Sequence, residues 1–259
     1  MRINTNVSSL VAQEANKNTS NNISSSLEKL STGLRINKAS DDASGLSIAD
    51  KLRTQASGLN QAVANGNSAV TLTQIADKAM AEQSNILDIV KQKLIQASTA
   101  TTSAEGIQAI GKDISKLLAQ IDNIASQTTY NGTALLQGSA QADAGVALTF
   151  QMGTLAADTI VTTAGVHSNT SGLNGLDAVY ADTSAWGATL PTDAGSAQAS
   201  ARLLLDNIDS SLTELNGWRA DFGSTQNQLE SSVRNLMTQV TNTKAAESVI
   251  RDVDYAQES

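Results

Sequence analysis

The sequence predicts a mainly helical protein, an elongated antiparallel coiled-coil or helical-bundle rod with a small tip that contains a β-hairpin. The first observation is a proline-free heptad stripe between Ala201 and Tyr255, interrupted only at Arg219 and Gln226. The second is composition: one proline, 3% aromatic residues and 40% hydrophobic residues favour long helices over a large aromatic core. A helix this long would run for roughly 80 Å, so it needs an equally long partner. The stripe comprises Leu205, Ile208, Leu212, Leu215, Phe222, Leu229, Val233, Leu236 and Val240.

The amino-terminal segment from Ile3 to Ile36 has apolar residues at the same steps of three and four. An Asn- and Ser-rich patch, EANKNTSNN, separates its two apolar groups. Such residues are poor helix formers, and a short helix without a packing partner is marginal in water. We therefore expect this segment to be helix-capable but disordered in a free monomer.

Three long helices are predicted after this segment, at about 44–97, 105–128 and 197–255. The first begins near Asp41, Asp42 and Ser44, which are good capping or first-turn residues. Gly58 and Gly66 lie inside it and each costs about 1 kcal/mol relative to Ala, which indicates close helix approach. Antiparallel packing of the last helix against the other two would bury every apolar stripe.

The segment between Gly132 and Gly195 differs in character. It holds nine of the 17 glycines, and residues 139–200 include no Lys or Arg. Residues 146–152 and 159–163 have the composition of strands, which predicts a β-hairpin. We interpret its aspartates as a solvated acidic surface and not as a cation site.

Composition also limits the chemistry. Cysteine is absent, which excludes disulfides and thiolate chemistry, and the one histidine, His167, lies in a Gly-rich loop expected to be exposed. Asp41 and Asp42 are adjacent and would diverge on a helix, so they cannot share a proton. A net charge of −8 argues against nucleic acid or an anionic membrane as partner. The sequence contains no run of about 18 apolar residues, which is the length needed to span a bilayer. The sequence predicts no enzyme, cofactor or metal.

Several segments resemble bacterial flagellin. They are MRINTNVSSL at the amino end, Leu30–Asn37 (LSTGLRIN), Ser40–Arg53 (SDDASGLSIADKLR), Gln127–Gly132 (QTTYNG) and Lys244–Ser259 (KAAESVIRDVDYAQES). The resemblance covers about 1–180 and 200–259. The residues that carry it, and that it implies pack between subunits, are Leu30, Leu34, Arg35, Asp41, Asp42, Gly45, Leu46, Ile48, Leu52, Arg53, Arg251, Asp252, Asp254 and Tyr255.

The resemblance implies a domain organisation and a function. Residues 1–43 would form an inner-core helix, 44–180 plus 196–259 a discontinuous rod domain, and 181–195 a short connection in place of outer domains. The chain would be exported by the type III route and polymerise into the extracellular flagellar filament for motility. Implied partners are other flagellin subunits, cap and hook-associated proteins and an export chaperone.

Two departures from the family pattern matter. The family continues past the Tyr-Ala-x-Glu-Ser motif into another amphipathic helix, so a chain that stops at Ser259 is expected to polymerise poorly. Flagellins sensed by Toll-like receptor 5 resemble Leu-Gln-Arg-Val-Arg-Glu-Leu where this chain has LDIVKQK. Ile cannot reproduce the planar fork of Arg, so weak receptor activation is expected. The residues of this receptor region are Leu87, Ile89, Val90, Lys91, Lys93 and Asp113.

Two other functions are compatible with parts of the sequence. A hook–filament junction protein would resemble flagellin at both ends. A glycan-binding adhesin would use the hydroxyl-rich segment, with Tyr180 and Trp186 as the candidate aromatic platforms.

Overall fold

The computed structural model describes residues 6–138, 145, 147–162, 166–189 and 194–258. The chain divides into two compact units. The first combines Met1–Ala62 with Asn235–Ser259, and the second is Val63–Arg234. This division follows the contacts within the chain and is not a test of the domain boundaries expected from the family, which stay a prediction.

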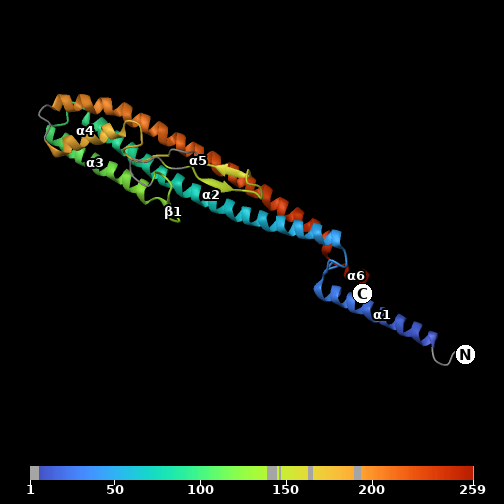
Figure 1. Cartoon of the computed structure of the whole chain (residues 1–259). Helices are drawn as coiled ribbons and strands as arrows, with labels where there is room; N and C mark the ends of the chain where they lie inside the picture. The colour runs from blue at the N-terminus through green and yellow to red at the C-terminus, as the bar shows by residue number, and fades with distance from the viewer. Residues whose placement is uncertain (1–5, 139–144, 146, 163–165, 190–193, 259) are drawn as a thin grey trace. The chain divides into compact units, whose positions relative to one another are not determined.

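The three predicted long helices are present (Figure 1). Two corrections apply. The last long helix ends at Arg251 and not at Tyr255, and a further helix occupies much of the stretch expected to be a short connection. The helices described are α1 (Val7–Thr32), α2 (Ala43–Ala97), α3 (Ala104–Gln127), α4 (Leu176–Ala188), α5 (Ala194–Arg251) and α6 (Tyr255–Glu258).

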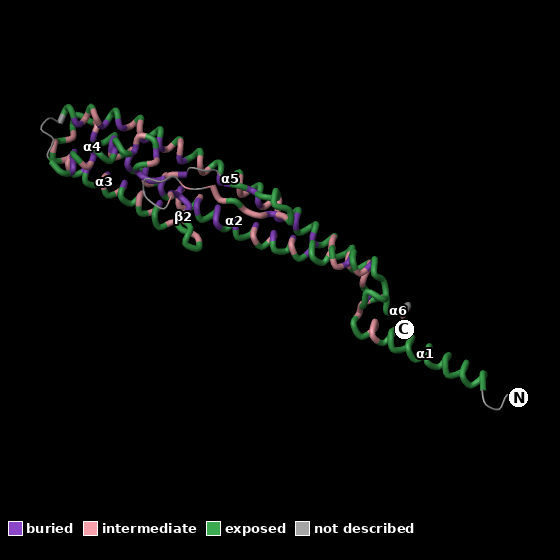
Figure 2. The backbone as a smooth tube through the Cα atoms, viewed as in Figure 1, coloured by how far each residue is buried: buried purple, intermediate pink, exposed green. Residues whose placement is uncertain are grey.

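The helix α1 runs without a break through the Asn-rich patch. The side chain of Asn6 accepts a hydrogen bond from Ser9 N at 3.3 Å, and Gly33 ends the helix in the left-handed region with φ 72°. None of its residues is buried, and Figure 2 shows most of its length as exposed, with intermediate burial only near its carboxyl end. Local capping therefore defines this helix, while tertiary packing within the chain contributes little. Its disorder in a free monomer stays a prediction.

Side-chain caps also start the next two helices. The Asp42 carboxylate accepts a hydrogen bond from Gly45 N at 2.9 Å, as the sequence predicted for the start of α2. At α3 the Ser103 hydroxyl accepts from Gly106 N at 3.2 Å. Each cap satisfies a backbone donor that the first helical turn leaves without an intrahelical partner.

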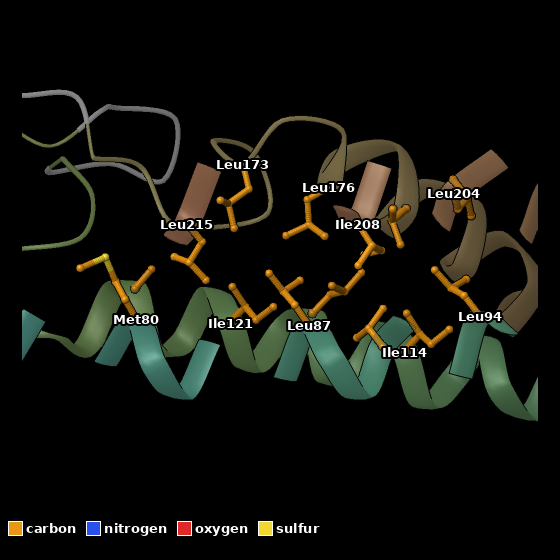
Figure 3. Packing of buried hydrophobic residues seen from close by; sticks show 14 of the residues in the cluster. Met80, Leu87, Leu94, Ile114, Ile121, Leu173, Leu176, Leu204, Ile208 and Leu215 are labelled. Carbon is orange, nitrogen blue, oxygen red and sulfur yellow. The ribbon is translucent and has the colours of Figure 1, made fainter. Parts of the chain in front are cut away.

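The core of the second unit lies between α2, α3, α4 and α5. Both α3 and α5 run antiparallel to α2 (Figure 1), as predicted. Figure 3 shows Met80, Leu87 and Leu94 of α2 meeting side chains from the other helices and from the loop before α4. The largest fully buried side chains are Met80, Leu87, Leu94, Ile107, Ile114, Leu118, Ile121, Leu136, Leu173, Leu176, Ile208 and Leu215.

The buried seam of α5 differs from the predicted stripe at two positions. Leu204 and Ser211 are buried, whereas Leu205 and Leu212 are half-buried. The Ser211 hydroxyl donates to Asn174 O at 3.0 Å and to Asn207 O at 2.9 Å, which satisfies a polar group at a core position. The prediction favoured Leu212 over Ser211 because leucine is more hydrophobic, and this choice placed the predicted seam one residue away from the buried one. The observed seam steps by three and four through Ala201, Leu204, Ile208, Ser211 and Leu215.

Two short antiparallel hairpins complete the second unit. The first pairs β1 (Thr129–Tyr130) with β2 (Thr133–Ala134), and the second pairs β3 (Thr149–Gln151) with β4 (Thr159–Val161). The second is the predicted hairpin, although Val146 and Thr163 of the predicted strands lie outside the described residues.

The β3–β4 hairpin packs against the side of α2. Asn65 Nδ2 donates to Gln151 O at 3.3 Å. A Cβ placed on Gly66 would lie 2.5 Å from Val233 Cγ2 and 2.7 Å from Met152 Cε, so the close approach predicted for this glycine is confirmed. Gly66 therefore allows α2 to meet both α5 and the hairpin.

Candidate functional site

Residues near the two ends of the chain meet in the first unit. Leu34 forms an antiparallel β-bridge with Asp252. Arg35 N donates to Arg251 O at 2.6 Å, and Val253 N donates to Gly33 O at 3.0 Å. We call residues 29–42 together with 248–258 the terminal clasp. It unites two of the segments that carry the sequence resemblance.

Side chains reinforce this backbone pairing. The Arg35 guanidinium donates to Ile250 O at 2.6 Å, and Lys29 Nζ lies 3.5 Å from a Glu258 carboxylate oxygen. The left-handed Gly33 lies against Tyr255, because a Cβ at Gly33 would be 3.1 Å from the tyrosine hydroxyl. The short α6 is thereby fixed beside the end of α1.

Asp41 shapes the turn between α1 and α2. Its carboxylate accepts hydrogen bonds from Lys38 N at 2.9 Å and Asn37 N at 3.0 Å. These two backbone donors, with Lys38 N the stronger influence, lower the pKa of Asp41 from its ordinary value. Lys38 pairs with Glu28 at 2.7 Å, and this hydrogen bond and charge raise the pKa of Lys38. The turn is thus held by a fixed carboxylate.

The aspartates of the carboxyl-terminal motif make local hydrogen bonds. Asp252 accepts a hydrogen bond from the Ser248 hydroxyl at 2.6 Å, and Asp254 accepts one from Ala256 N at 2.9 Å. Together with the β-bridge between Leu34 and Asp252, these bonds fix the chain after α5 ends at Arg251. The Nε of Arg251 is buried and has no hydrogen-bond partner among the described residues.

The other predicted packing residues divide by exposure. Gly45 is buried, and a Cβ there would lie 2.8 Å from Ile36 Cδ1. Leu30, Leu46 and Leu52 are half-buried, which leaves part of each side chain uncovered. Ile48 is 47% exposed, while Arg53 is exposed and pairs with Asp50 of its own helix at 3.1 Å.

The receptor region lies in the second unit. Leu87 and Val90 are buried in the core, whereas Ile89 is 42% exposed. Lys91 pairs with Asp209 of α5, and Lys93 pairs with Asp113 of α3 at 3.1 Å. Because Leu87 and Val90 are buried, Ile89 is the exposed apolar residue of the receptor region.

Two side chains lie differently from their predicted settings. His167, expected to be exposed, is half-buried and packs against Gly172. Trp186 is only 8% exposed, and a Cβ placed on Gly111 of α3 would lie 3.0 Å from the Cβ of Trp186. A buried indole cannot serve as a glycan platform, so of the two aromatic candidates only Tyr180 is exposed.

Sequence reasoning missed the buried polar side chains that fix the loop before α4. Gln83 Nε2 donates to Ile121 O at 3.1 Å and to Ser168 O at 2.7 Å. Asn169 Nδ2 donates to Gln137 Oε1 at 2.9 Å. The signal available in the sequence was Gln83 itself, a polar residue four positions before the core residue Leu87 on the stripe of α2.

No group of three or more potential metal-ligating side chains occurs among the residues that the structure describes. Within the same residues, no helix has the length and apolar character needed to cross a membrane. The apolar side chains that remain uncovered are therefore the main unexplained feature. On α1 these are Val7, Leu10, Val11, Ile23 and Leu27, each 55–60% exposed.

Comparison with family models identifies both ends of the chain. The model for the bacterial flagellin N-terminal helical region matches residues 3–141, and the model for the C-terminal helical region matches residues 205–259. Both halves of the terminal clasp lie within these matches.

Individual relatives agree. The flagellar filament 33 kDa core protein of Treponema phagedenis is 34% identical, covering 100% of this chain and 88% of that protein. Flagellin of Bacillus subtilis is 36% identical, and the match covers 100% of this chain and 89% of that protein. Flagellin B of Helicobacter pylori is 49% identical over 53% of this chain, and this chain spans only 27% of that protein.

Solved structures share the fold. The crystal structure of Bacillus cereus flagellin matches with a TM-score of 0.53 at 27% identity, covering 71% of this chain and 94% of that one. A protein described as flagellar hook-associated, from Vibrio parahaemolyticus, matches with a TM-score of 0.67 at 12% identity, covering 82% and 99%. That low identity shows a common fold alone. The matched ends, together with relatives aligned along the whole chain, place this protein in the bacterial flagellin family.

Proposed function

We propose that the chain is a structural subunit, secreted and polymerised into the bacterial flagellar filament, and that it has no enzymatic role. The observation that carries this proposal is α1, a 26-residue helix with no buried residue and five exposed large apolar side chains. Each of these side chains is 55–60% exposed, so covering the exposed part would contribute about 1–2 kcal/mol per side chain, somewhat over half of the value for full burial. Neighbouring subunits would supply the missing cover.

The arrangement of these side chains supports packing on more than one side. Val11 and Ile23 are separated by 12 positions, which at about 3.6 residues per turn places them about 120° apart around the helix. The amino-terminal apolar group and the later one thus face different directions. A helix inside a layer of neighbours has such a pattern, whereas a helix docked on a single groove needs one stripe.

The terminal clasp supports the same proposal. It joins the end of α1 to the carboxyl-terminal motif by two backbone hydrogen bonds and by Arg35. Exposed Ile48 and half-covered Leu46 and Leu52 lie on the adjoining part of α2. We propose that these signature residues pack between subunits. Residues 1–43 would form the inner layer, as the family resemblance implies.

Seeded polymerisation tests the proposal. The chain is mixed with sheared flagellar filaments from the parent bacterium, and incorporation is measured by sedimentation and electron microscopy. Because a chain that stops at Ser259 is expected to polymerise poorly, we expect weak but measurable incorporation of the chain and of Asn16→Lys, and none of Leu10→Lys. Both residues are exposed on α1, so neither change alters the fold of the single chain. Absence of incorporation by the unchanged chain would contradict the subunit function, and equal incorporation of both variants would contradict the role of α1.

The hook–filament junction alternative is less well supported. The hook-associated structure is only 12% identical to this chain, whereas the relatives aligned along its full length include a flagellin and a filament core protein. Cap and hook-associated proteins and an export chaperone are proposed as partners by family analogy. Long filaments made by the chain would favour the subunit, and a defined short zone would favour the junction protein.

We also propose weak activation of Toll-like receptor 5. The exposed Ile89 lacks the guanidinium of the sensed pattern, and Lys91 and Lys93 are held in ion pairs with Asp209 and Asp113. A cell reporter assay should show higher potency for Ile89→Arg and no gain for Ile95→Arg, another exposed position on α2. Full potency of the unchanged chain would refute this proposal.

A further inference from the structure

The chain contains four Asn-Gly pairs, beginning at Asn65, Asn131, Asn174 and Asn216. In such a pair the following peptide nitrogen can attack the side-chain amide carbon with little steric hindrance, because glycine has no Cβ. The attack requires a backbone that can rotate. The four pairs share this chemistry, so differences between them come from their structural settings.

The pair Asn131-Gly132 lies at the tip of the β1–β2 hairpin. Both residues have positive φ, 50° and 80°, as the two-residue turn of a hairpin requires, and both are exposed. Nothing lies within 4 Å of the position that a Cβ on Gly132 would occupy. Two residue pairs, Thr129 with Ala134 and Tyr130 with Thr133, and one hydrogen bond from Leu135 N to Thr128 O at 3.1 Å hold the hairpin closed. So short a hairpin opens readily, which releases the turn from its folded backbone angles.

Two of the other pairs lie inside long helices. Asn65-Gly66 is in α2, where Asn65 Nδ2 donates to Gln151 O and Gly66 packs against Val233. Asn216-Gly217 is in the middle of α5. In a helix interior the peptide nitrogen donates to a carbonyl four residues earlier, so it is not available for attack until the helix opens locally.

The pair Asn174-Gly175 precedes α4 and is held by side chains of α5. Asn174 N donates to Glu214 Oε2 at 3.0 Å, and Asn174 O accepts from the Ser211 hydroxyl at 3.0 Å. A Cβ on Gly175 would lie 2.9 Å from Asn207 Cβ. This loop has positive φ at glycine as the β1–β2 turn does, but it is anchored on both sides of the asparagine.

We propose that Asn131 is a site of spontaneous deamidation. The Gly132 nitrogen forms a bond to Asn131 Cγ, the bond from Cγ to the amide nitrogen breaks, and ammonia leaves with the proton lost from the Gly132 nitrogen. Water then opens the cyclic imide. Addition at Cγ gives aspartate, and addition at the backbone carbonyl carbon gives isoaspartate. Either product adds a carboxylate at the hairpin tip, and isoaspartate also lengthens the backbone within the turn.

Peptide mass spectrometry of the intact folded chain, aged at neutral to mildly alkaline pH, tests the proposal. Replacement of the amide by a hydroxyl is followed at all four pairs in the same sample. We expect Asn131 to be lost about tenfold faster than Asn174, the factor for about 1.4 kcal/mol of local opening, and Asn65 and Asn216 to be slower still. Asn131→Gln should abolish the fast product, because ring closure would then require a six-membered imide.

A parallel sample in concentrated urea separates structure from sequence. There the four pairs should react at similar rates, because each asparagine is followed by glycine and no fold restrains it. A native rate at Asn131 no greater than at Asn174, or the same ranking in urea as in the folded chain, would overturn the proposal. The measurement uses the free chain, so it does not depend on the filament function.

Discussion

Replacing one helical glycine should destabilise the second unit, while the same replacement elsewhere should stabilise it. A Cβ on Gly111 of α3 would lie 2.8 Å from Thr183 O, 3.0 Å from Gly187 N and 3.0 Å from Trp186 Cβ. Two of these are backbone atoms of α4, so no side-chain rotation relieves the contact. A Cβ on Gly217 of α5 would meet nothing within 4 Å. The two positions thus offer a matched comparison of one chemical change.

The magnitudes follow from two opposing effects. Glycine to alanine within a helix gains about 1 kcal/mol at either position. At Gly111, overpacking costs about 1–3 kcal/mol, and contact with backbone puts the cost in the upper half of that range. We expect Gly111→Ala to be less stable than the unchanged chain by about 1–2 kcal/mol and Gly217→Ala to be more stable by about 1 kcal/mol.

Urea denaturation followed by far-ultraviolet circular dichroism measures both changes. The fluorescence of Trp186, measured with Trp218→Phe in every variant so that the second tryptophan does not contribute, gives a second reading. Trp186 borders Gly111, so its emission should shift in Gly111→Ala alone. A midpoint for Gly111→Ala as high as that for Gly217→Ala would refute the close packing of α3 on α4. Equal destabilisation of both would refute the open position of Gly217.

Three further outcomes are expected. Ile121→Ala, at a fully buried core position, should lower the free energy of unfolding by about 2–5 kcal/mol; Ile89→Ala at an exposed position should change it by less than about 0.5 kcal/mol in the same denaturation assay. Backbone donors lower the pKa of Asp41, so the stabilisation of the turn by its carboxylate should be complete above pH 3.8, the ordinary pKa, and be lost as pH falls through the lowered pKa. A nuclear magnetic resonance titration should show this loss, and Asp41→Asn should lack the transition. Gly33→Ala, at φ 72°, should cost about 1–2 kcal/mol and speed proteolysis within residues 33–42, whereas Gly223→Ala, in open space on α5, should not.

Periodicity predicted the long helices but not the local choice of buried side chain. The three-and-four spacing located α5, yet the seam uses Leu204 and Ser211 where neighbouring leucines looked more suitable. Ser211 can be buried because Asn174 O and Asn207 O accept its hydroxyl proton. One of these acceptors comes from a distant loop, so a single-sequence pattern could not reveal it.

The helix α4 was missed for a related reason. Its buried residues Leu176, Val179, Thr183 and Trp186 step by three, four and three, but lie among Ala, Gly and Asp in a glycine-rich segment. Gly187 and Gly111 let it approach α3 closely, so glycines that looked like loop residues mark a helix contact. The terminal clasp could not be derived from spacing either. The family resemblance named its residues, while only the fold shows that Leu34 pairs with Asp252.

The span of the terminal clasp constrains the order of folding. Arg35 and Ile250 are 215 positions apart in the chain. Closing a flexible loop of that length costs about 5 kcal/mol in chain entropy, more than a few hydrogen bonds return. If the start of α2 and the end of α5 pair first, the remaining gap is only the short turn before α2, and the cost falls to about 2 kcal/mol. The terminal clasp therefore closes late, after α2 and α5 have paired. Its formation requires that the middle of the chain has already folded.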